Sequence, residues 1–229
     1  MFANGYELER RVSSFMVGVY GWMSCALVIT AGISYWVAHT PVIFNYMYTN
    51  PGIVIGLLFA QLGLVIALSF FINRMSFITA LILFIAYAAS LGFTLSSIFY
   101  VYTELSIVST FLTTALTFGF MSLYGYLTKT DLSSIGSMAI MVLIGLIIGL
   151  FINMFIRSTQ FDYILSGIGV IIFVLLTAYD TQRLKQIGRT HLVDQETMAK
   201  VTLLGALTLY LDFINLFLFL LRFMGQRRE

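Results

Sequence analysis

The stretch Leu203–Arg222, LLGALTLYLDFINLFLFLLR, decides the class of fold. Its length matches the roughly 20 residues that an α-helix needs to cross the hydrocarbon core of a bilayer. Its only charged residues are Asp212, near the middle, and Arg222, at the end. Such a stretch predicts a transmembrane helix, and the central carboxyl group predicts a function beyond anchoring.

The composition of the whole chain extends this prediction. Hydrophobic residues make up 60% of the 229 residues and charged residues only 10%, whereas about 25% of residues are charged in a typical soluble protein. So few charges cannot cover a globule of this size in water, and most of the surface must therefore face lipid. The net charge of +2 and the lack of a long basic run argue against a nucleic-acid partner.

Seven stretches of the sequence are long and apolar enough to span the lipid bilayer. The predicted spans are about 13–38, 51–73, 77–101, 106–127, 135–156, 162–182 and 203–222. They fill most of the chain, so residues 1–229 are predicted to form a single, all-α polytopic membrane domain. The first span is too long for a signal peptide and no clear cleavage site follows it, so we expect it to be retained.

The lysine and arginine residues predict the orientation, because they concentrate in inner loops. With the N-terminus inside, eight of them fall on the inner side and only Arg157 on the outer side through the first six spans. Arg222, Arg227 and Arg228 lie outside if the last segment crosses fully, which gives eight against four. They lie inside if it re-enters and returns, which gives eleven against one. The charges favour an inside C-terminus, while the length permits a full crossing.

Two carboxyl groups stand out within the predicted spans, where an ionisable residue costs about 2.5–3.5 kcal/mol to insert at the helix centre. Asp212 lies in the middle of the last span and Asp180 near the inner end of the sixth. Each belongs to a polar stripe with helical spacing, which includes Thr208 and Asn215 in the last span and Thr177 in the sixth. We expect both stripes to face the bundle interior or a wet cavity.

Three polar positions admit two explanations each. Asp180 lies one turn from Arg183, so an interfacial ion pair is the alternative to a buried role. Gln61, midway through the second span, either hydrogen-bonds between helices or lines a path. Arg74 follows that span, and it is either a positive-inside anchor or a partner for Asp180 on the same side.

Small residues and histidines are expected to have structural or solvated positions rather than functional roles. Gly145, Gly149 and Asn153 are spaced four residues apart, which predicts a close helix contact in the fifth span. His39 and His191 fall in predicted connectors, so we expect them to be solvated.

The sixth and last spans carry two stretches that resemble the signature sequences of the Bax inhibitor-1 family, the transmembrane Bax inhibitor motif group. They are LTAYDTQRLK at 176–185 and GALTLYLDFINLFLFLLR at 205–222. The segments 61–65 (QLGLV) and 87–99 are similar to family segments too. The resemblance therefore covers nearly the whole chain, and it is closest to the bacterial branch.

The resemblance implies a fold in which six helices surround a central, C-terminal seventh, in the cytoplasmic (inner) membrane of a bacterium. It also implies a pH-sensitive Ca²⁺ leak whose sensor is an aspartate pair, here Asp180 and Asp212, with Ca²⁺ as the transported ion and no resident cofactor. In the family, an arginine of the second helix bonds to this pair in the closed state, and Arg74 is the candidate. Some members have a glutamate at Gln61, so one cation-attracting charge is missing here.

The chemistry of two carboxyl groups supports such a sensor. Two carboxylates in a low-dielectric interior cannot both ionise cheaply, so they share a proton and titrate as a unit. The protonated pair would tie the sixth helix to the seventh and close the route. The deprotonated pair would repel and offer oxygen ligands for transient Ca²⁺ binding. We therefore expect a leak that is favoured at higher pH.

Two other functions use the same sequence features. The aspartates could serve a Ca²⁺/H⁺ exchanger as alternating proton and cation sites. The protein could instead bind and regulate other membrane proteins, as a protease modulator or a stress and cell-death suppressor does. An enzyme is not expected, because the sequence has no metal-ligand histidine spacing, nucleophile elbow, P-loop or dinucleotide fingerprint.

Overall fold

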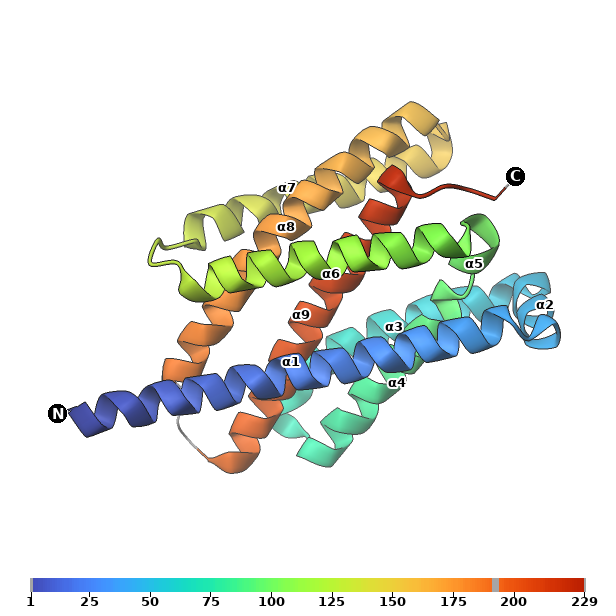
Figure 1. Ribbon diagram of the computed structural model, residues 1–229. Helices are drawn as coiled ribbons and strands as arrows, with labels where there is room; N and C mark the ends of the chain where they lie inside the picture. Colours follow the sequence, from blue (N-terminus) through green and yellow to red (C-terminus); the bar gives the residue numbers. More distant parts are fainter. Residues whose placement is uncertain (1, 191–193, 229) are drawn as a thin grey trace. The chain divides into compact units, whose positions relative to one another are not determined.

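The computed structural model describes residues 2–190 and 194–228, which are almost entirely α-helical (Figure 1). The elements in chain order are α1 (Phe2–Ala38), α2 (Pro41–Thr49), α3 (Pro51–Phe71), the short 3₁₀ helix η1 (Ile72–Arg74), α4 (Phe77–Leu95), α5 (Ile98–Val101), α6 (Glu104–Leu127), α7 (Ser133–Ile156), α8 (Thr159–Thr190) and α9 (Gln195–Met224). His39 lies in the turn after α1, whereas His191 lies outside the described residues.

Proline and hydroxyl residues set the starts of several helices. Pro41 and Pro51 occupy the first positions of α2 and α3, where the missing N–H of proline costs no helical hydrogen bond. The Ser76 hydroxyl accepts a hydrogen bond from the Thr79 amide and caps α4. The Thr103 hydroxyl caps α6 in the same way. These caps satisfy amide groups that have no partner within their own helix.

Seven helical stretches of the described chain are long and apolar enough to cross a membrane. They are Tyr6–Ala38, Pro51–Arg74, Phe77–Val101, Glu104–Leu127, Ser133–Ile156, Thr159–Arg189 and Gln195–Met224. This confirms the predicted class, an all-α membrane protein with seven candidate spans. That residues 1–229 form a single domain stays a prediction.

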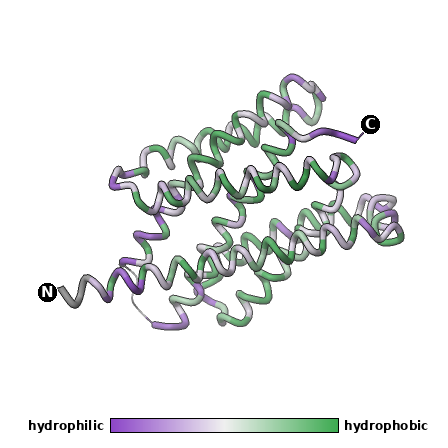
Figure 2. The backbone as a smooth tube through the Cα atoms, viewed as in Figure 1, coloured by the Kyte–Doolittle hydropathy of each residue, from purple (hydrophilic) through white to green (hydrophobic). Residues whose placement is uncertain are grey.

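The helices are apolar on the outside as well as the inside. Hydrophobic residues predominate along the helices, and hydrophilic residues gather at their ends and in the connecting turns (Figure 2). Large side chains such as Phe70 and Phe155 are exposed, which in a membrane places them against lipid. Burial differs between spans, since 72% of the apolar stretch of α9 is buried against 11% for α3 and α7. The arrangement of six helices around α9 stays a prediction.

The chain forms two compact units. The first contains Met1–Val101 and Gly188–Tyr210, and the second contains Tyr102–Ile187 and Leu211–Glu229. In the first unit α1 packs closely on α4, because Gly92 lets the backbone of Thr30 approach. The Thr30 hydroxyl donates to the Ala88 carbonyl at 2.9 Å, and this bond fixes the register of the two helices.

Glycine residues set the close contacts of the second unit. A Cβ atom on Gly149 would lie 2.9 Å from the Leu165 side chain, so α7 and α8 meet there. A Cβ atom on Gly169 of α8 would overlap the Phe219 ring of α9. The prediction for Gly149 is thus correct. The prediction for Gly145 is wrong, because a Cβ atom there would meet no atom of the described residues within 4 Å; this glycine lies on the exposed face of α7.

The end of α9 bears on the path of the last segment. α9 is one unbroken helix of 30 residues (Figure 1), which gives it a length of about 45 Å. The tail that follows docks on the start of α6: the Thr103 amide donates to the Gln226 carbonyl at 3.1 Å, and the Gln226 amide donates to the Ser106 hydroxyl at 2.9 Å. An unbroken helix is long enough for a full crossing, and the side of the membrane on which the C-terminus lies stays a prediction.

The basic tail has an acidic partner. Arg228 pairs with Glu104 at the start of α6 at 3.3 Å. The first spans usually dominate the orientation of a membrane protein, so a basic tail after the last span is tolerated.

Candidate functional site

Asp180 lies on a turn of α8 that is tightly packed within the second unit. Its side chain is only 9% exposed, and its neighbours Thr177 and Thr181 are fully buried. The backbone of α6 approaches this turn at Gly125, where a Cβ atom would overlap the Ala178 carbonyl. This burial does not fit a fully solvated carboxyl group, and because Asp180 also interacts electrostatically with Arg183, the choice between an ion pair and a buried role stays a prediction.

Asp212 lies on the half of α9 that belongs to the second unit, and it is only 5% exposed. The next residue, Phe213, packs edge-on against two rings of α6, those of Phe111 and Phe118, with centroid separations of 5.4 Å in both cases. These contacts fix which face of α9 points away from α6. Asp212 is thus held in a largely apolar setting.

The structure brings the two aspartates together. The two carboxyl groups lie close enough to interact with each other, and neighbouring carboxyl groups in an apolar setting cannot both ionise cheaply. One oxygen of Asp212, Oδ2, is buried and has no hydrogen-bond partner among the described residues. Arg183, on the next turn of α8, interacts electrostatically with Asp180. The site is therefore a buried pair of neighbouring carboxyl groups with one charged side chain nearby.

Gln182 anchors the turn that carries Asp180. Its side-chain oxygen accepts from the Leu132 amide at 2.9 Å, and its nitrogen donates to the Thr130 carbonyl at 2.8 Å. Both partners lie in the connection between α6 and α7. Gln182 is 7% exposed, so the two bonds are shielded from water. One buried side chain thus joins the α6–α7 connection to the aspartate site.

A carboxyl group within the α6–α7 connection, that of Asp131, caps the start of α7. Asp131 accepts a hydrogen bond from the Ser133 amide at 2.9 Å at the start of α7. Hydrogen bonds from Ser133 lower the pKa of Asp131 from its ordinary value of 3.8. Asp131 therefore stays ionised near neutral pH and keeps the connection in one conformation.

The predicted supporting residues satisfy their polar groups locally. The Thr177, Thr208 and Asn215 side chains each donate to the carbonyl four residues earlier in the same helix. Thr177 and Asn215 belong to the same unit as the aspartate pair, whereas Thr208 belongs to the first unit. Their role as a polar path stays a prediction.

Gln61 and Arg74 both belong to the first unit. The Gln61 amide donates to the Ser90 carbonyl at 3.0 Å and to the Thr94 hydroxyl at 2.7 Å, so it joins α3 to α4. Arg74 is exposed at the end of η1. A role for Arg74 as a partner of the aspartate pair stays a prediction.

Sequence reasoning missed two polar side chains that the structure places in the interior. One is Gln182, which reads in the sequence as part of the polar end of a helix. The other is Tyr210, which is fully buried in the first unit and hydrogen-bonds the Thr30 hydroxyl at 2.6 Å. Their sequence positions could have indicated them, because each residue lies two places from one of the two aspartates and is therefore close to the site along the chain.

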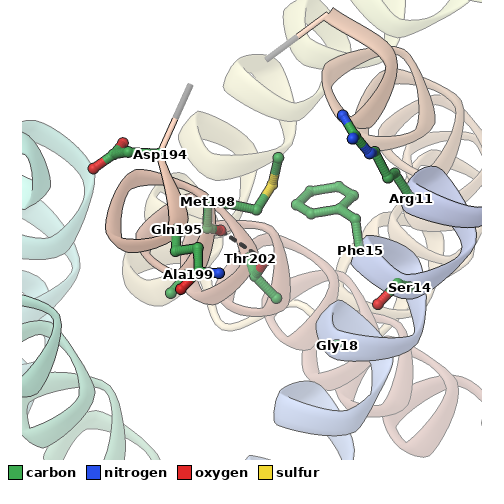
Figure 3. Close-up of a pocket in the computed structure, with 9 residues that line it drawn as sticks. All are labelled: Arg11, Ser14, Phe15, Gly18, Asp194, Gln195, Met198, Ala199 and Thr202. Carbon is green, nitrogen blue, oxygen red and sulfur yellow. Dashed lines mark hydrogen bonds between the residues drawn. The ribbon is translucent and has the colours of Figure 1, made fainter. Parts of the chain in front are cut away.

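A groove of about 650 Å³ lies between α1 and the start of α9 in the first unit (Figure 3). It is lined by Arg11, Ser14, Phe15, Gly18, Asp194, Gln195, Met198, Ala199 and Thr202. Asp194 accepts from the Thr197 amide and caps α9, and in Figure 3 its carboxyl group points away from Arg11. Neither aspartate of the pair lines this groove, so it is separate from the candidate site.

The described residues contain no cluster of three or more His, Cys, Asp or Glu side chains that could hold a metal ion. Ca²⁺ is usually bound by six to eight oxygen atoms, and two carboxyl groups supply at most four. Transient Ca²⁺ binding by Asp180 and Asp212 stays a prediction.

The fold and the site define a class of protein, a polytopic α-helical membrane protein with a pair of carboxyl groups buried between two of its helices. Residues 12–229 match the model of the family described as inhibitor of apoptosis-promoting Bax1. The chain belongs to this family, the Bax inhibitor-1 family, which confirms the resemblance seen in the sequence.

Relatives from several bacteria are similar to this chain over nearly their full lengths. The inner membrane protein YbhL of Escherichia coli (strain K12) is 49% identical over 218 residues, which cover 95% of this chain and 93% of that protein. An uncharacterized protein of Borreliella burgdorferi is 45% identical over 217 residues, covering 95% and 94%. The uncharacterized protein RP147 of Rickettsia prowazekii is 43% identical over 218 residues, covering 94% and 90%.

Proposed function

We propose that this protein is a pH-sensitive Ca²⁺ leak channel that is closed when Asp180 and Asp212 share a proton. The observation that carries the proposal is the contact between these two buried carboxyl groups, of which Asp212 Oδ2 has no hydrogen-bond partner among the described residues. An ionisable residue within a membrane span is costly and usually functional. Two such residues in contact are a stronger indication than either alone.

The closed state follows from the shared proton. The proton converts two mutually repelling carboxylates into a hydrogen-bonded pair, which joins α8 to α9 in a low-dielectric setting. This bond also removes negative charge that would attract a cation. A Ca²⁺ ion therefore meets neither a charged ligand nor an open route.

The open state follows from loss of that proton. Two carboxylates at hydrogen-bonding distance repel, so α8 and α9 are pushed apart at this level. The ionised oxygens are the hard ligands that Ca²⁺ prefers. The free energy that favours opening thus grows as the pH rises through the range in which the pair gives up its proton.

The location and orientation belong to the same proposal. The relative YbhL is named an inner membrane protein, and we place this chain in a bacterial inner membrane too. The basic residues favour a cytoplasmic N-terminus, so the tail after α9 and the start of α6 face outward. In this orientation Asp180 lies toward the cytoplasmic end of α8, and Arg74 lies on the cytoplasmic side as a candidate partner in the closed state.

The test is Ca²⁺ flux into liposomes that contain the purified protein, measured at a low and a high pH. The wild type should leak faster at the higher pH, and Asp212→Asn should abolish that difference, because an amide cannot ionise. The matched control is Asp162→Asn, the same change at the other end of α8. An unchanged pH profile in Asp212→Asn would rule out the pair as the sensor.

A pH gradient across the same liposomes distinguishes a leak from an exchanger. A leak only dissipates the Ca²⁺ gradient, whereas an exchanger uses the proton gradient to move Ca²⁺ uphill. Absence of any protein-dependent flux would instead favour a regulatory role toward other membrane proteins. No enzymatic activity enters the proposal.

A further inference from the structure

We infer that Gln182 is a positioning residue of the aspartate pair: it holds the α8 turn that bears Asp180 against the α6–α7 connection, so that the two carboxyl groups meet. The inference rests on the proposed function for its effect on Ca²⁺ flux. Its geometric part, that Gln182 sets the distance between Asp180 and Asp212, stands independently of flux.

The first step is the geometry of the Gln182 amide. Its oxygen and its nitrogen are both used, by the Leu132 amide and the Thr130 carbonyl. A side-chain amide that bonds two backbone groups of one connection is fixed in both position and rotation. Because the amide is buried, water cannot replace either bond without a gap opening around it.

The second step is the packing of the same turn. Ala178 is contacted by Gly125 of α6, and Tyr179 is contacted by Gly136 of α7. The Thr181 hydroxyl donates to the Ser122 hydroxyl of α6 at 3.4 Å. Three of the four residues before Gln182 are thus held by α6 and α7. Asp180, which lies among them, is the one that reaches toward α9.

The third step is the charge around the pair. Asp180 faces Asp212 of α9 and Arg183 of its own helix. Lys185, one turn beyond, donates to the Tyr126 carbonyl of α6 and lies over the Tyr126 ring. Lys129 and Asp131, in the α6–α7 connection, are exposed. Gln182 itself is neutral, so its removal changes the position of Asp180 without adding or removing a charge.

The consequence concerns the closed state. A shared proton needs the two carboxyl groups at hydrogen-bonding distance, and this bond weakens steeply when its geometry is lost. Loosening the turn would therefore favour the ionised pair, and the channel would stay open to lower pH. Since each net hydrogen bond contributes modestly to stability, we expect the midpoint of the pH profile to fall by about 0.5–1 pH unit.

The experiment compares Gln182→Met with Gln160→Met in the full-length protein. Methionine has a similar length and fills a similar volume but forms neither hydrogen bond. Gln160 is exposed near the start of the same helix, so its variant makes the same chemical change away from the site. The expected result is a lower pH midpoint of Ca²⁺ flux for Gln182→Met and an unchanged midpoint for Gln160→Met.

A second readout measures the distance without flux. Asp180→Cys and Asp212→Cys are combined in a Cys25→Ser background, and the yield of a short bifunctional thiol crosslink is measured with and without Gln182→Met. We expect Gln182→Met to lower the yield several-fold in protein that elutes as a folded species. Gln182→Ala, which also removes side-chain volume, should lower it at least as much.

The outcomes separate the two proposals. An unchanged crosslink yield in Gln182→Met overturns the positioning role, whatever the flux does. A lower yield with an unchanged pH midpoint supports the geometric part and overturns the effect of Gln182 on Ca²⁺ flux. A wild type without Ca²⁺ flux contradicts the proposed function, while the crosslink still decides whether Gln182 positions Asp180.

Discussion

The two halves of the aspartate pair are held in different ways. The α8 turn around Asp180 is fixed by the Gln182 hydrogen bonds and by the close backbone contact at Gly125. The α9 turn around Asp212 is held by aromatic contacts, in which Phe213 meets two rings of α6. Hydrogen bonds and backbone contacts are directional, whereas ring contacts adapt to small shifts. The comparison indicates that α8 is the fixed side of the aspartate pair and α9 the adjustable side.

The largest effect is expected where α8 is held by backbone contact. Gly125→Ala places a Cβ atom onto the Ala178 carbonyl. Neither the α6 backbone nor the α8 backbone can move away there without breaking main-chain hydrogen bonds of its helix. We expect a loss of about 3 kcal/mol or more, measured as a lower Tm in detergent and a smaller folded fraction by size exclusion. The control is Gly119→Ala on the same helix, where a Cβ atom meets no described atom within 4 Å. This variant should be neutral or gain up to about 1 kcal/mol. Equal behaviour of the two variants would contradict a fixed α8.

A smaller effect is expected on the α9 side. Phe213→Leu removes two edge-on ring contacts but keeps a large apolar side chain, so we expect a loss of about 1–2 kcal/mol. Thermal unfolding of the two proteins in the same detergent measures the difference. Phe120→Leu is the matched control, because Phe120 is 71% exposed on α6 and its ring faces lipid. A loss as large as that of Gly125→Ala would show that α9 is held as rigidly as α8, and the comparison would fail.

The sequence alone was sufficient for the class of fold and for the members of the pair. Seven apolar stretches predicted seven helices, and the scarcity of charge within them singled out Asp180 and Asp212. Both inferences depend on the cost of polarity in lipid, which is local and readable from one residue at a time.

What the sequence could not predict depends on contacts between helices. Gln182 looks like a solvated residue at a helix end, because its partners at Leu132 and Thr130 lie about 50 places away and only folding brings them near. Gly145 and Gly149 have the same spacing pattern, yet only Gly149 meets a neighbouring helix. The docking of the tail on α6 was out of reach for a related reason, because a charge count carries no information about such contacts.

The smallest effect is expected at the C-terminal end of α9, where the tail meets α6. Arg228 and Glu104 form an ion pair whose side chains are 46% and 58% exposed, so water and salt screen it. Arg228→Gln should therefore cost less than about 0.5 kcal/mol, and less still in high salt. The tail is held instead by main-chain bonds such as that between Thr103 and Gln226, which this variant keeps. Thermal unfolding at low and high ionic strength provides the measurement. A loss above about 1 kcal/mol that salt does not reduce would mean that the ion pair, and not the main-chain bonds, anchors the C-terminal end of α9. The position of α9, the adjustable helix, would then be fixed at that end by the Arg228–Glu104 pair.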